Sequence, residues 1–256
     1  MSEFRNNQPQ YTAHKTWDAL TRRGITMPAQ VTEAMDLLTY VESVKPRNDV
    51  DHAPIAEAYL NREPAEQIAQ KAAVMYAAGL QFSAWSNARD RAARGVLEAL
   101  RFNHDELVAG MAELAAPLIE AIEHVARLDT HSVDALVVAG RNDDARILAE
   151  LQTTVAELKA LYELRRVTTP PGFRYASGAI DCGEWQDPRK VTHASGANPH
   201  SYYVHGVQLG GRLWFPTVGE AESTARNIRA AVEHDRQTEE AAGFTERVRR
   251  FGAAHA

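Results

Sequence analysis

Residues 97–128 carry the sequence LEALRFNHDELVAGMAELAAPLIEAIEHVARL, the most regular stretch of this 256-residue chain. Counting in sevens from residue 97 and from residue 100 gives ten positions, of which nine are apolar if alanine is included. Such spacing is typical of helices that pack along a narrow apolar seam. The ten seam positions are Leu97, His104, Met111, Leu118 and Val125, and Leu100, Leu107, Leu114, Ala121 and Leu128.

Two features predict that this helical stretch is bent or broken. Asn103 is a capping residue followed three positions later by Glu106, which is typical of a new helix start. Pro117 lacks a backbone N–H and should kink the helix that contains it. His104, the polar seam residue, either caps the new helix or faces water, or it sets the register and pH response of the seam. We favour the first alternative.

A second seam follows the turn at Gly140. Its helix is expected to start at Asn142-Asp143-Asp144 and to end near Arg165-Arg166, because positive charge suits a helix C-terminus. Two seamed helices joined by a turn predict an antiparallel helical hairpin. The sequence leaves open whether the seams pack within one chain or between chains. The seam positions of this second helix are Leu148, Leu151, Val155, Leu158 and Tyr162.

The seamed helices belong to a predicted helical domain over residues 11–166, preceded by a flexible N-terminus over 1–10. Upstream helices are expected at about 28–45, at 53–60 and from Pro64 to about residue 102. The last of these has its own narrow seam. That seam comprises Ile68, Ala72, Met75, Gly79 and Phe82.

A domain boundary is predicted at Thr168-Thr169-Pro170-Pro171-Gly172, because two prolines and a glycine cannot continue a helix. Residues 167–236 then predict a small α+β domain. Residues 202–208 and 212–215 have strand-like composition, and the paired glycines at 210 and 211 suit a tight hairpin turn. A helix should follow from the capping box of Thr217 and Glu220. Looser strands are expected at 173–175 and 179–181.

The predicted fold class is therefore mainly α. Long helices form a helical hairpin or bundle with coiled-coil-like seams, and a small C-terminal α+β unit has a β-hairpin followed by a helix. About 60 residues are marginal for independent stability, so this unit should pack on the helical part. Residues 237–256 are expected to form a polar tail with a short helix over 244–251.

Composition narrows the classes of function. The chain has 28 Lys and Arg against 34 Asp and Glu, a net charge of −6, so no global positive field attracts a polyanion. Neither a secretory signal nor a run of about 18 apolar residues is present, which predicts no membrane partner. A single cysteine excludes an intrachain disulfide and fits a reducing compartment. We expect a location in the cytoplasm or in a particle assembled there.

Potential metal ligands are concentrated in the second part of the chain. The candidates are Cys182, His193, His200 and His205, with 10, 6 and 4 residues between successive members. Zinc accepts such groups, but these intervals match no standard finger or ribbon spacing. We therefore expect no metal and no cofactor, and histidines that make local hydrogen bonds or face solvent.

Catalytic motifs are missing from the sequence. It contains no GxSxG elbow, no GxxxxGK[ST] phosphate loop and no HExxH zinc motif. Neither seamed helix carries the Glu-x-x-His pair of di-iron bundles. We expect that the protein is not an enzyme.

A nucleic-acid partner is a weaker alternative. Two basic runs lack the interleaved aromatic residues of known nucleic-acid modules. Within the predicted hairpin, the residues expected to face a groove of the nucleic acid are Tyr203, Arg212 and Trp214. The two basic runs are Arg89, Arg91, Arg94 and Arg101, and Arg247, Arg249 and Arg250.

The preferred hypothesis is a non-enzymatic structural or assembly protein of the scaffold, connector or virion-associated type. Its helices would mediate self-association or binding to another protein. The main alternative is an enzyme or small-ligand binder whose site is lined by Trp185, His193, His200, His205 and Trp214. The predicted interface residues are Leu97, Leu100, Leu107, Met111, Leu114, Leu118, Val125, Leu128, Leu148, Leu151, Val155, Leu158 and Tyr162.

Overall fold

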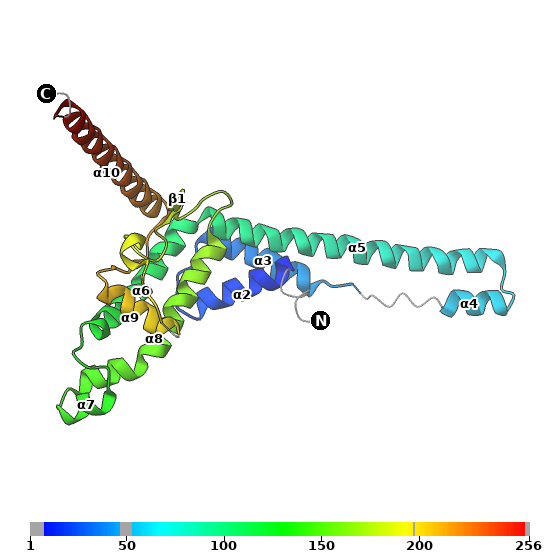
Figure 1. The fold of residues 1–256 in the computed structure, drawn as a ribbon. Helices are drawn as coiled ribbons and strands as arrows, with labels where there is room; N and C mark the ends of the chain where they lie inside the picture. The colour runs from blue at the N-terminus through cyan, green and yellow to red at the C-terminus, as the bar shows by residue number, and fades with distance from the viewer. Residues whose placement is uncertain (1–7, 47–52, 197, 254–256) are drawn as a thin grey trace. The chain divides into compact units, whose positions relative to one another are not determined.

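The computed structural model describes residues 8–46, 53–196 and 198–253, and the side chains of 241–253 lie outside that description. The described chain is mainly α-helical with one small antiparallel β-hairpin, which confirms the predicted fold class (Figure 1). Within the described ranges, no helix combines the length and the apolar character needed to cross a membrane.

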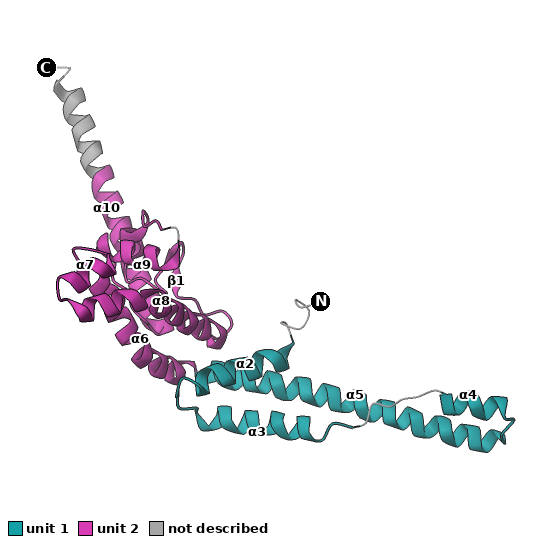
Figure 2. Ribbon diagram, turned by 90° about the horizontal axis from the view of Figure 1, so that it is seen from below, with its two compact units in different colours: residues 1–103 teal, residues 104–256 magenta. Residues whose placement is uncertain are grey.

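The chain divides by its contacts into two compact units, Met1–Asn103 and His104–Ala256 (Figure 2). The predicted boundary after residue 166 follows a change in composition, whereas this division follows packing. The described helices of the first unit are α2 (Pro9–Thr21), α3 (Ala29–Ser43), α4 (Ala53–Leu60) and α5 (Ala65–Phe102). Those of the second are α6 (His104–Ala126), α7 (Val133–Val138), α8 (Asn142–Thr168), the 3-10 helix η1 (Pro188–Val191), α9 (Pro199–Gln208) and α10 (Val218–Ala253).

In the first unit, α2, α3 and α4 pack along the long helix α5. The side chain of Trp85 fixes α3 to α5, because its Nε1 donates to the Val41 carbonyl at 2.7 Å. The predicted break at Asn103 is confirmed, since α5 ends at Phe102. However, Asn103 Nδ2 donates back to the Ala99 carbonyl at 2.8 Å, so this side chain closes α5 rather than opening α6.

In the second unit, α6 and α8 form an antiparallel pair, as the two seams predict. Side chains join them at both ends: His124 to Asp144 at one, and His104 to Thr168 at the other. Pro117 lies within α6 and does not end the helix.

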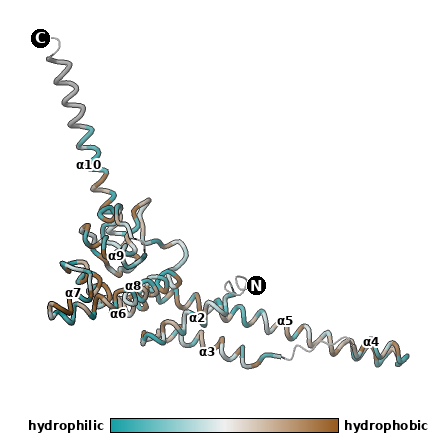
Figure 3. The backbone as a smooth tube through the Cα atoms, turned by 60° about the horizontal axis from the view of Figure 1, so that its bottom comes forward, coloured by the Kyte–Doolittle hydropathy of each residue, from teal (hydrophilic) through white to brown (hydrophobic). Residues whose placement is uncertain are grey.

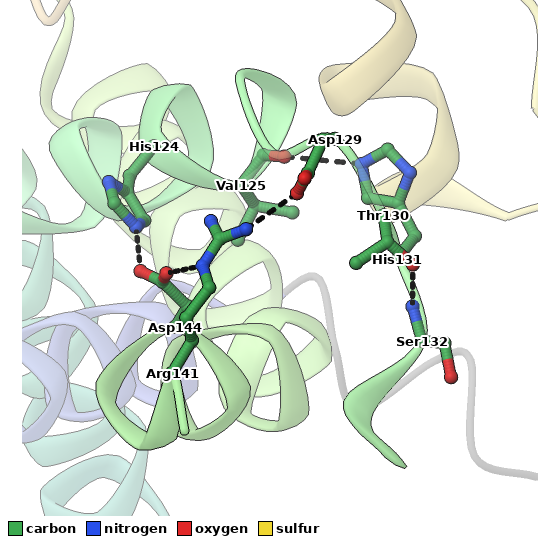
Figure 4. Close-up of polar contacts among 8 residues, drawn as sticks. All are labelled: His124, Val125, Asp129, Thr130, His131, Ser132, Arg141 and Asp144. Carbon is green, nitrogen blue, oxygen red and sulfur yellow. Dashed lines mark hydrogen bonds and ion pairs between the residues drawn. The ribbon is translucent and has the colours of Figure 1, made fainter. Parts of the chain in front are cut away.

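An ionic cluster joins the end of α6 to the start of α8 (Figure 4). Arg141 donates to Asp144 from Nε and to Asp129 from Nη1, each at 2.6 Å. His124 Nε2 lies 2.6 Å from the other oxygen of Asp144. The hydrogen bonds from His124 and Arg141 hold the pKa of Asp144 below its ordinary value.

The β-hairpin lies at a different place from the main prediction. It pairs β1 (Ala176–Ser177) with β2 (Ile180–Asp181), close to the looser strands expected there. The predicted strand over 202–208 is wrong, because Pro199–Gln208 is the helix α9. Asn198 caps its start by accepting from the Ser201 N–H at 2.9 Å.

The paired glycines end α9 instead of forming a hairpin turn. Gly210 has φ of +87°, a left-handed conformation that suits glycine. Gly211 N–H donates to the Gly206 carbonyl at 3.0 Å, and Gly210 N–H donates to the Val207 carbonyl at 2.9 Å. This pair of bonds is the Schellman motif of a helix C-terminus. Residues 212–215 accordingly form no strand, apart from the single bridge of Leu213 to Trp185.

The last helix, α10, begins at the predicted capping box. Thr217 N–H donates to Glu220 Oε2 at 2.8 Å, and Glu220 N–H donates to Thr217 Oγ1 at 3.3 Å. The helix then continues to Ala253, so the separate short helix predicted over 244–251 is wrong. Residues 229–240 are exposed and mostly hydrophilic (Figure 3). Salt bridges from Arg236 to Glu233 and Glu240 stabilise this part.

Candidate functional site

The 38-residue helix α5 uses one face for packing inside the first unit. Ile68 and Trp85 are each 9% exposed, and Val96 is fully buried, on the side where α2, α3 and α4 lie. The other members of the predicted seam are half-buried. These members are Ala72, Met75, Gly79 and Phe82.

The opposite face of α5 carries an apolar stripe that is exposed. Residues spaced by three or four lie on the same side of a helix. On this side, Tyr76 is 71% exposed and Leu80 is 54% exposed. We define the outer stripe as the exposed residues Ala69, Ala73, Tyr76, Ala77, Leu80 and Ala84.

From Ala73 to Ala84, the outer stripe lies in a part of α5 that has no charge on any side. No charged residue occurs between Lys71 and Arg89. Contiguous exposed apolar surface marks an interaction site. The adjacent α4 adds Tyr59 and Leu60 to the exposed apolar surface of this unit. α5 thus presents a surface that the described helices of its own unit leave uncovered.

The two ends of the outer stripe have opposite charge. Glu66 precedes Ala69 by three residues, and Arg91 follows Ala84 by seven, so both continue the same face of α5. Both side chains are exposed. In the part of the chain that the structure describes, neither forms an ion pair, whereas nearby Lys71 pairs with Glu63 at 2.7 Å.

Most of the predicted interface residues are buried inside this chain. Leu114 is 36% exposed, and Leu97, Leu118 and Leu148 are half-buried. α6 instead buries Ala115 and Ile122, because an α-helix of 3.6 residues per turn drifts away from a strict seven-residue count. The remaining nine are buried: Leu100, Leu107, Met111, Val125, Leu128, Leu151, Val155, Leu158 and Tyr162.

The candidate metal ligands do not converge. Cys182 is fully buried, and its thiol donates to the Gln186 carbonyl at 3.7 Å. His193 is exposed, while His200 and His205 border a cavity of about 520 Å³ beside α8. Among the described residues, no three His, Cys, Asp or Glu side chains are grouped so that they could hold a metal ion.

A second candidate site is a cavity of about 750 Å³ in the second unit, at the C-terminal end of α8. Arg165 lines it and is only 4% exposed. Its guanidinium donates to the carbonyls of Gly183 at 2.6 Å and Pro216 at 3.2 Å. The rings of Tyr175 and Phe215 lie 4.1 and 4.6 Å from it. Burial lowers the pKa of Arg165.

Two buried donors in the wall of this cavity lack a hydrogen-bond partner among the described residues. They are Nε of Arg165 and Nε1 of Trp185, which is 4% exposed. Buried N–H groups are normally paired, so these two almost inaccessible donors are exceptions among the described residues. The cavity also contains carboxylates, because Asp181 and Glu184 line it.

His104 is part of a buried polar chain beside this cavity, so the expectation that it faces water is wrong. It is 3% exposed, and its Nε2 lies 2.8 Å from the Tyr175 hydroxyl. Its Nδ1 lies 3.2 Å from Thr168 Oγ1, which itself donates to the Arg165 carbonyl at 3.0 Å. Burial is the main cause that holds the pKa of His104 below its ordinary value.

The aromatic residues expected to face a nucleic-acid groove are used inside the second unit. Tyr203 is 2% exposed, and its hydroxyl donates to Glu184 at 2.7 Å. Trp214 Nε1 donates to the Cys182 carbonyl at 2.7 Å. Of the five residues expected to line a shared ligand site, only Trp185 lines the Arg165 cavity.

Comparison with known proteins adds no relative. No family model, no curated protein and no solved structure matches this chain. Function therefore has to be inferred from the geometry of the chain itself. Sequence reasoning followed one seam of α5 and missed the outer stripe, although the uncharged run over 72–88 was a signal for it. From the sequence, Arg165 was interpreted as a positive charge at a helix C-terminus, and no neighbouring residue indicated that its side chain is buried.

Proposed function

We propose that this protein is a non-enzymatic assembly protein that self-associates through the outer stripe of α5. The observation that carries the proposal is the exposure of Tyr76 and Leu80 in a helix segment without charge. Burying the exposed half of a leucine side chain is worth about 1 kcal/mol, and a two-fold contact gains it twice. Scaffolds, connectors and virion-associated components all act through association of this kind.

A substitution in the outer stripe tests the proposal. Leu80→Glu places a charge in the centre of the surface, and Gln67→Glu adds the same charge at an exposed position of α5 outside the stripe. Light scattering over a wide concentration range measures the mass of each form, and circular dichroism checks that α5 remains helical. We expect the wild type and Gln67→Glu to associate, and Leu80→Glu to shift towards the monomer.

Two outcomes would contradict this function. A wild-type protein that stays monomeric at every concentration has no self-association to explain. A Leu80→Glu variant that associates as strongly as the wild type would mean that another surface is responsible for the self-association.

The Arg165 cavity supports a second candidate function, the binding of a small oxyanion or other acceptor-bearing molecule. The supporting observation is the pair of buried donors that lack a partner among the described residues, Arg165 Nε and Trp185 Nε1. Inorganic phosphate and citrate are suitable probes. A ligand that binds the native state raises the thermal midpoint, and Trp185→Phe should reduce that rise because it removes one donor while keeping a ring. If neither probe moves the midpoint, oxyanion binding is wrong.

A further inference from the structure

We infer that the partner of the outer stripe is α5 of a second copy of this chain, lying antiparallel, with Glu66 of each copy facing Arg91 of the other. This inference rests on the proposed function and gives it a geometry. It is carried by two observations: an exposed apolar stripe, and charges of opposite sign at its two ends that form no ion pair with another described residue.

The register follows from the charged ends. With Glu66 opposite Arg91 of the second copy, the two-fold axis passes between residues 78 and 79 of both helices. The same register places Ala73 opposite Ala84 and Ala77 opposite Leu80. Alanine thus faces alanine or Leu80, and these small side chains let the two helices approach closely. The contact spans about 37 Å of helix at 1.5 Å per residue.

The charges select the antiparallel direction. A parallel pair would bring Glu66 against Glu66 and Arg91 against Arg91, and like charges at facing positions are destabilising. An antiparallel pair turns both into opposite-charge contacts. A closed two-fold interface requires a surface that is complementary to itself, and the outer stripe meets this requirement in charge.

The described helices that pack on α5 leave this surface open. α2, α3 and α4 contact α5 on the side of Ile68, Trp85 and Val96, which is the side turned away from Tyr76 and Leu80. Alanine side chains form most of the stripe, so little side-chain entropy is lost on pairing. Two copies can therefore approach along α5 without displacing α2, α3 or α4.

A charge-swap experiment tests the pairing. Glu66→Arg and Arg91→Glu each turn two attractive contacts into repulsive ones, so we expect each variant to raise the dimer dissociation constant about tenfold. The double variant restores opposite charges and should return to within about twofold of the wild type. Sedimentation equilibrium measures the dissociation constants of the wild type and the three variants, and circular dichroism verifies that each variant remains helical.

Cysteine cross-linking tests the direction independently. In the antiparallel register, residue 77 of the two copies is offset by about 4.5 Å along the helix and residue 69 by about 28 Å. A short bismaleimide should therefore link Ala77→Cys dimers and leave Ala69→Cys unlinked. The wild type is the control, because its own Cys182 is fully buried.

The outcomes separate this inference from the proposed function. Restoration by the double charge swap together with linking at 77 alone supports the antiparallel pair. Linking at both positions, or a double variant that stays weak, overturns it, while dissociation by Leu80→Glu would still uphold association through the stripe. A monomeric wild type would overturn both.

Discussion

Replacing Gly206 by alanine tests how α9 packs on Trp185. A Cβ at residue 206 would lie 2.6 Å from Cη2 and 2.7 Å from Cζ2 of the indole. Carbon atoms in contact are normally about 3.5–4.0 Å apart, so the new methyl overlaps the ring by about 1 Å. Trp185 is 4% exposed and stacks on Tyr203 at 5.9 Å between centroids, so moving the ring away from Gly206 would disturb this stacking.

Two opposing effects set the magnitude for Gly206→Ala. Overpacking of a filled core costs about 1–3 kcal/mol. Replacing glycine by alanine inside a helix stabilises the helix by up to about 1 kcal/mol. We therefore expect the free energy of unfolding to fall by about 1–2 kcal/mol, with a thermal midpoint lower by about 3–6 °C.

Urea unfolding followed by circular dichroism and tryptophan fluorescence measures this change. The matched control is Gly219→Ala in α10, where a Cβ meets no atom within 4 Å, and this variant should be as stable as the wild type or slightly more stable. A Gly206→Ala protein at least as stable as the wild type would refute the packing. That result is the one expected if residues 202–208 were a strand, because alanine is better than glycine in a strand interior.

Three further predictions concern the second unit. Arg165→Met leaves the carbonyls of Gly183 and Pro216 without their donor, so the free energy of unfolding should fall by about 2–4 kcal/mol in a urea titration; a loss below about 1 kcal/mol would contradict a structural role. Thr217→Ala removes the acceptor for the Glu220 N–H and should cost about 1 kcal/mol, while Thr217→Ser should retain most of the stability, and equal losses in both would argue against the cap. His104 has a folded-state pKa below its ordinary 6.5, with Asp105 opposing and Arg165 reinforcing the effect of burial, so the unfolded chain takes up the proton first as the pH falls. This pKa difference contributes to the free energy of unfolding above pH 6.5, and the contribution is lost as the pH falls towards the folded-state pKa. His104→Gln should make the free energy of unfolding depend less on pH in this range, and an unchanged dependence would show that other groups cause it.

Helix ends with a local chemical signal were predictable. The structure starts α5 after Pro64, places α4 at Ala53–Leu60 and forms the capping box of Thr217 and Glu220 as expected. At the start of α10, the side chains that set the boundary bond to backbone N–H groups within one turn. Such interactions depend on neighbouring residues alone.

The segment around α9 was not predictable in the same way. The dipeptide Gly210-Gly211 suits both a hairpin turn and a Schellman motif, because both need a positive φ. The Schellman motif forms because Asn198 caps a helix and because the indole of Trp185 packs against Gly206. The second of these contacts joins residues that are 21 positions apart.

The burial of polar groups was also decided by packing. His104 occupies a seam position by count, yet its hydrogen bonds go to Thr168 and Tyr175, more than 60 residues away. Arg165 has the sequence context of an ordinary helix end, but three aromatic rings and two carbonyls enclose it. No pattern of neighbouring residues indicates such contacts.

The sequence by itself determined the fold class, most helix boundaries and the pairing of α6 with α8, because periodicity and caps act over a few residues. The tertiary structure alone decided which face of α5 is covered. Both the predicted seam that starts at Ile68 and the outer stripe are apolar at spacings of three and four, so the periodicity of α5 cannot distinguish them. Only the positions of α2, α3 and α4 bury one face and leave Tyr76 and Leu80 exposed.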